Sequence, residues 1–70
     1  MFRNMIQNKV GGYVREMRQM MDELLDLMQQ QERYQAQGNQ EMATQMFARS
    51  KNQAQKMSAY FSEVAQSFGL

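Results

Sequence analysis

The chain has 70 residues, a formal net charge of +1 and 43% hydrophobic residues, and it contains no Cys, His, Pro or Trp. Without Cys or His there are no disulfides, no metal or haem ligands of those types and no Cys- or His-based nucleophile pair, so we expect neither an enzyme nor a bound metal or other cofactor. A chain of this length forms one domain at most, and small domains without cross-links or metals often depend on oligomerisation for stability.

The N-terminal segment has helical spacing but meets a glycine pair at Gly11-Gly12. Two glycines inside a helix cost about 2 kcal/mol relative to alanine. When Val10 is taken as heptad position a, both glycines fall at b and c, which allows a continuous helix from about residue 2. The alternative is a break at Gly11-Gly12, with residues 1–10 forming a separate short helix or arm.

A long first helix is predicted to reach about residue 36, because strong helix formers such as Leu, Met, Glu, Gln and Arg dominate this stretch. Apolar residues fill heptad positions a, d and e, a wider stripe than the a/d seam of a simple helix pair. The stripe consists of Val10, Tyr13, Val14, Met17, Met20, Met21, Leu24, Leu27 and Met28.

A turn is predicted at Gly38-Asn39. Gly38 suits the left-handed backbone conformation that follows the last helical residue. Asn39 suits the first capping position of a new helix, where its side chain accepts a hydrogen bond from the backbone.

A second helix is predicted over about residues 40–68, ending at Phe68-Gly69-Leu70. Restarting the heptad at Ala43 gives a second apolar stripe of Ala43, Met46, Phe47, Ala54, Met57, Tyr60, Phe61, Val64 and Phe68. The small residues Ser50, Ala54 and Ser58 lie on or beside it, and we expect them to pack opposite large side chains of the first helix.

The two stripes predict an all-α fold, an antiparallel two-helix hairpin in a single domain of residues 1–70. Because both stripes are wider than the seam that a hairpin uses, apolar surface is left to be covered by oligomerisation or by a partner. We expect this interaction face to consist of Tyr13, Met17, Met20, Met21, Leu24, Met28, Met46, Phe47, Met57, Tyr60, Phe61 and Val64.

Residues around the turn resemble the central part of a tetratricopeptide repeat. Its recurring aromatic, turn glycine and small residues are matched by Tyr34, Gly38, Ala43, Phe47 and Ser50. The likeness covers about 17 residues and departs from the repeat upstream, at Leu27, Gln30 and Gln31, and downstream, at Gln55. It implies a tight helix–turn–helix with small residues where the helices meet.

Charges are grouped in blocks along the chain. Residues 20–32 carry acids without a base, and the segments on either side are basic. One interpretation is that Asp22, Glu23 and Asp26 pair across the hairpin with Arg49, Lys51 and Lys56 and fix its register. The other is that these three acids form a docking patch for a basic partner.

No signal peptide or transmembrane segment is apparent, so we expect a cytoplasmic or intravirion protein. Eight bases against seven acids, with no groove-reading motif, argue against nucleic-acid binding, and we expect no membrane association. The leading functional hypothesis is a structural or assembly protein that forms a homo-oligomer, a dimer or larger. The alternative is a small helical regulator or chaperone, similar in general form to secretion chaperones or phage inhibitors, that captures a helix of a target protein.

Overall fold

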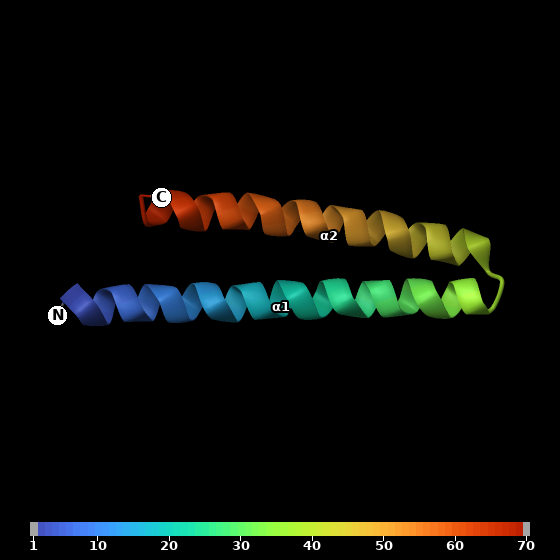
Figure 1. Ribbon diagram of the computed structural model, residues 1–70, viewed down its shortest axis with the longest axis horizontal. Coiled ribbons are helices and arrows are strands. Elements are labelled where there is room, and N and C mark those ends of the chain that lie inside the picture. Colours follow the sequence, from blue (N-terminus) through green and yellow to red (C-terminus); the bar gives the residue numbers. More distant parts are fainter. Residues whose placement is uncertain (1, 70) are drawn as a thin grey trace.

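The computed structural model describes the backbone of residues 2–69 and the side chains of residues 10–69. It consists of two helices, α1 (Phe2–Ala36) and α2 (Gln40–Ser67), which lie side by side and antiparallel (Figure 1). The molecule is a rod of 56 × 17 × 11 Å. The predicted all-α hairpin is therefore confirmed.

The glycine pair does not interrupt the first helix, because α1 continues through Gly11 and Gly12. An added Cβ would meet nothing within 4 Å at either position, so no close contact requires glycine there. The hypothesis of one continuous helix is correct at the level of the backbone. The first turns of α1 extend beyond the end of α2 (Figure 1).

The turn has the predicted caps. Gly38 has a φ of 75°, and the Asn39 N–H donates to the Tyr34 carbonyl at 2.8 Å while the Gly38 N–H donates to Gln35 at 3.0 Å. These two bonds close the last turn of α1 as a Schellman motif. The Asn39 side-chain oxygen then accepts from the Met42 N–H at 3.2 Å and caps α2.

Most of the fully or partly covered side chains form a seam between the helices. They recur at alternating intervals of three and four residues, which places them at heptad positions a and d. On α1 they are Tyr13, Met17, Met20, Leu24, Leu27, Gln31 and Tyr34, and on α2 they are Ala43, Met46, Ser50, Gln53, Met57, Tyr60 and Val64.

Two polar residues occupy the middle of this seam. The Gln53 amide donates to the Met20 backbone carbonyl of the facing helix at 3.0 Å. The Ser50 hydroxyl donates to the Met46 carbonyl within α2 at 2.9 Å. Both residues are buried, and Gln53 makes a specific polar contact across the hairpin, so this bond helps to fix the register of α2 on α1.

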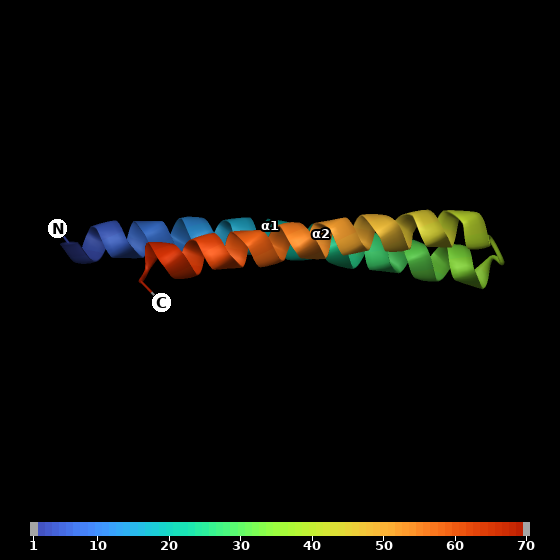
Figure 2. The same cartoon turned by 90° about the horizontal axis from the view of Figure 1, so that it is seen from above.

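The two ends of the hairpin are packed differently. In the turn half (residues 21–53), small side chains at Ala43 and Ser50 are buried in the seam. In the terminal half (residues 1–20 and 54–70), the described seam holds larger side chains. The helices lie close together near the turn and diverge toward the chain ends (Figure 1), and they cross at a shallow angle (Figure 2).

Aromatic rings bridge the helices in the terminal half. Tyr13 of α1 contacts Tyr60 edge to face, with ring centroids 6.0 Å apart, and Phe68 in the same way at 5.6 Å. This geometry is favourable for aromatic pairs. The rings are bulky, and they hold the helices further apart than Ala43 and Ser50 do in the turn half.

Candidate interaction surface

Eight large apolar side chains are exposed among the described residues. Most occupy heptad positions e and b, which adjoin the seam on one side of each helix. In an antiparallel pair the e positions of both helices lie on the same side, so these residues form one surface, here called the apolar face. Its members are Val10, Val14, Met21, Leu25, Met28, Phe47, Phe61 and Phe68.

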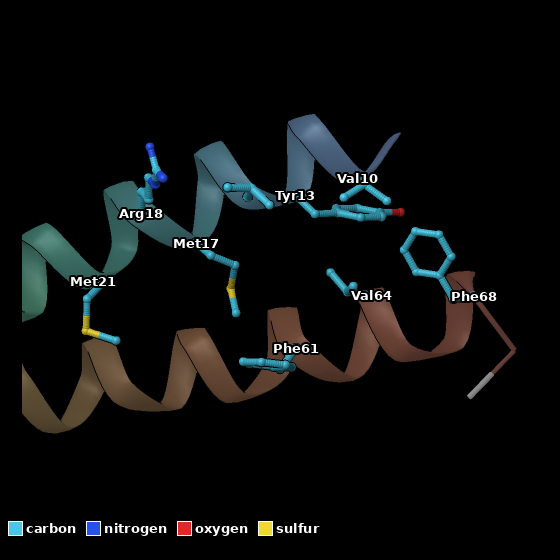
Figure 3. A pocket seen from close by; sticks show the side chains of 9 residues that line it. Val10, Tyr13, Met17, Arg18, Met21, Phe61, Val64 and Phe68 are labelled. Carbon is cyan, nitrogen blue, oxygen red and sulfur yellow. The ribbon is translucent and has the colours of Figure 1, made fainter. Parts of the chain in front are cut away.

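An open groove of about 400 Å³ runs along the terminal half of the apolar face. Both helices contribute to its walls, and nearly all of the lining is apolar; the lining side chains are Val10, Tyr13, Val14, Met17, Arg18, Met21, Phe61, Val64 and Phe68. Figure 3 shows Met17 pointing from α1 toward α2, the Tyr13 ring beside the Phe68 ring, and Arg18 pointing away from α2. The groove therefore lies where the helices diverge.

The predicted interaction residues divide into two sets. Eight of them lie in the seam and are covered at least in part by the facing helix: Tyr13, Met17, Met20, Leu24, Met46, Met57, Tyr60 and Val64. The other four, Met21, Met28, Phe47 and Phe61, belong to the apolar face and are 45–61% exposed. Only this second set, together with the groove walls, is available to a further partner.

Sequence reasoning missed two features of this surface. Leu25 is 48% exposed but stands outside the a/d/e stripe, although its b position adjoins Met21 and Met28 on the helix. Gln53 is buried in the seam and was overlooked because it is polar. The seven-residue interval that joins Met46, Gln53 and Tyr60 was the available signal.

The three acids of the predicted charged patch are all exposed. Asp26 accepts a hydrogen bond from the Gln30 amide of its own helix at 2.8 Å. Among residues 10–69 the polar contact between the helices is the one from Gln53 to Met20, not one between these carboxylates and a base of α2. Asp22 and Asp26 occupy positions f and c, away from the seam, so these two acids are not placed to fix the hairpin register.

The terminal half also contains one perturbed ionisable group. The pKa of Tyr60 is raised above 10.0, mainly because burial disfavours the charged phenolate, and further because Glu16, Tyr13 and Glu63 lie nearby. Folding therefore favours the neutral phenol, as suits a ring that packs on Tyr13.

The described residues contain no group of three or more carboxylates, cysteines or histidines that could hold a metal ion. Within that part of the chain, neither helix is long and apolar enough to cross a membrane. No family model matches the chain, and no match was found among curated proteins or among solved structures. The apolar face is therefore the feature of this chain that bears on function.

Proposed function

We propose that this chain is a non-enzymatic assembly protein that self-associates through the apolar face. The observation that carries the proposal is the set of eight large apolar side chains left 37–61% exposed on one side of a two-helix rod. Contiguous apolar surfaces of this kind on small proteins mark sites of association.

The hairpin and the proposed interface use different positions of the same heptad. Positions a and d are covered within the hairpin, while e and b remain open. Stacking two hairpins through their e and b positions makes a four-helix bundle, in which every helix gains a second neighbour. Removing apolar surface from water contributes about 25 cal/mol per Å², so covering half-exposed Phe, Leu and Met side chains on both copies favours the pair.

Light scattering coupled to gel filtration, over a range of chain concentrations, tests the proposal. We expect the parent chain to form at least a dimer in the micromolar range. Replacing Phe47 and Phe61 together by Ser should give a helical monomer, because both residues are more than half exposed in the hairpin and support the interface rather than the fold. A compact parent monomer at high micromolar concentration would overturn the proposal.

A matched control separates loss of apolar surface from loss of helix. Phe47 and Phe61 changed together to Leu keep the face apolar and should keep the oligomer. Circular dichroism recorded on both double variants must show the parent helix content. If the Leu variant is monomeric as well, association depends on something other than apolar burial.

One observation favours a second candidate, a helical regulator or chaperone. The groove is open and apolar, and helix-in-groove recognition uses grooves lined in this way. Under that hypothesis the isolated chain stays monomeric and binds an amphipathic helix of a target. Monomeric mass at high concentration, with tight one-to-one binding of such a target helix, would support this function over self-assembly.

A further inference from the structure

The apolar face has two unlike ends. In the terminal half it is hollowed by the groove. In the turn half the helices are close together (Figure 1), and Leu25, Met28 and Phe47 are 48%, 49% and 56% exposed. One end of the face therefore offers an apolar groove and the other offers exposed apolar side chains, and the two meet when two copies run in opposite directions.

Side chains of the apolar face are spaced evenly about one level of the hairpin. Val14 and Met28 each lie seven residues from Met21, and Phe47 and Phe61 each lie seven residues from Ala54. Met21 and Ala54 are themselves about equally far from Gly38 along the chain, so they lie at the same level of the hairpin. A two-fold axis at this level, perpendicular to the helices, places the turn half of one copy against the grooved terminal half of the other.

The charge distribution favours the same arrangement. The terminal half carries five bases and two acids, whereas the turn half carries three bases and five acids. Two copies that run in opposite directions place each basic half against an acidic half. Copies with both turns at the same end place basic half against basic half and acidic half against acidic half. Complementary charge of this kind orients association.

One pair of charged side chains follows directly from this symmetry. An axis at Met21 places residue 18 of one copy opposite residue 24 of the other, close to the exposed Asp22. Arg18 stands at the rim of the groove, and position f holds Asp22 at the edge of the same surface. The symmetry forms the pair twice, and the parallel arrangement offers Arg18 no acid at this level.

The broad side of the rod is long enough for an extended contact. It measures 56 by 17 Å, an outline of the same order as the ~800 Å² that each partner buries in a standard interface. Because the axis lies near the middle of the hairpin, the two copies overlap over almost their full length.

We infer that the occupant of the apolar face is a second copy of this chain in antiparallel orientation, related by the two-fold axis. Leu25, Met28 and Phe47 of each copy then enter the groove of the other. The inference rests on the proposed self-association and adds its geometry. The two turns then lie at opposite ends of the dimer, and Asp22 of each copy meets Arg18 of the other.

Electron–electron distance measurement on a spin label tests the orientation, since the chain has no native Cys. Gln37→Cys places one label at each turn, at an exposed position. At 1.5 Å per residue, the antiparallel dimer separates the two labels by about 50 Å. In a dimer with both turns at the same end, the two labels lie within about 25 Å of each other. A short distance in a dimer overturns the orientation alone, while a monomer mass with no distance overturns the proposed function.

A charge exchange tests the predicted pair independently. Arg18→Asp and Asp22→Arg should each weaken dimerisation several-fold, because each creates two like-charge contacts across the interface. The double variant restores opposite charges and should recover most of the parent affinity. If the double variant is as weak as the two single losses combined, Arg18 and Asp22 do not meet and this geometry is wrong. Asp26→Arg, on an outward position of the same helix, is the control.

Discussion

The turn half and the terminal half follow the same seam pattern but are packed differently. Near the turn, Ala43 and Met46 are each 2% exposed, and the small Ala43 and Ser50 allow close packing. Near the chain ends, Tyr13, Tyr60 and Phe68 stack edge to face, and a groove opens beside them. Heptad spacing thus decides which residues of the two helices face each other, while side-chain size decides how closely the helices pack at that level.

The largest effect is expected in the turn half. Met46→Ala should lower the free energy of unfolding by about 2–5 kcal/mol, because it leaves a cavity under a fully packed side chain. Phe61→Ala, in the terminal half, should change the unfolding of the monomer by less than about 0.5 kcal/mol, since that ring is 61% exposed. Urea unfolding at low chain concentration measures both. Equal losses would show that the two halves do not differ as described.

Glycine substitutions should have opposite signs in the two halves. Gly38→Ala in the turn should cost about 1 kcal/mol, because its φ of 75° strains any residue with a Cβ. Gly12→Ala in the terminal half should stabilise the chain by about 0.8–1 kcal/mol, since the site is helical and has free space. Thermal unfolding of the two variants checks this, and stabilisation by Gly38→Ala would contradict the turn geometry.

The smallest effect is a loss of stability at alkaline pH that arises in the terminal half. The pKa of Tyr60 is raised by burial and by Glu16, Tyr13 and Glu63, so folding favours the neutral phenol. Its contribution is complete below pH 10 and is lost as the pH rises through the folded-state pKa. Melting temperatures recorded between pH 9 and 11 should fall less steeply in Tyr60→Phe than in the parent.

The fold could be predicted from the sequence because its determinants are local. Gly38 and Asn39 each act through bonds to residues within five positions, and the helix interiors contain strong helix formers. The predicted bounds agree with the observed helices except that α2 ends at Ser67, with Phe68 as its cap. The continuous helix through Gly11-Gly12 was one of two open alternatives.

The surface could be predicted only in part, because it depends on how two distant segments meet. Counting apolar residues omitted Gln53, whose buried position depends on a carbonyl 33 residues away. Eight predicted interface residues are covered at least in part by the facing helix, and three of these also line the groove. This division depends on how both helices are rotated toward each other. The groove was not predicted, since the divergence of the helices arises from the combined bulk of Tyr13, Tyr60 and Phe68.

The central claim, that a second copy covers the apolar face, is tested most directly by methionine methyl NMR with a soluble nitroxide. Met46 is buried in the hairpin, whereas Met21 and Met28 are 45% and 49% exposed. At low chain concentration the nitroxide should broaden the Met21 and Met28 signals and spare that of Met46. As the concentration rises through dimerisation, Met21 and Met28 should become protected as well. Continued broadening of both signals at the highest concentration would contradict the account.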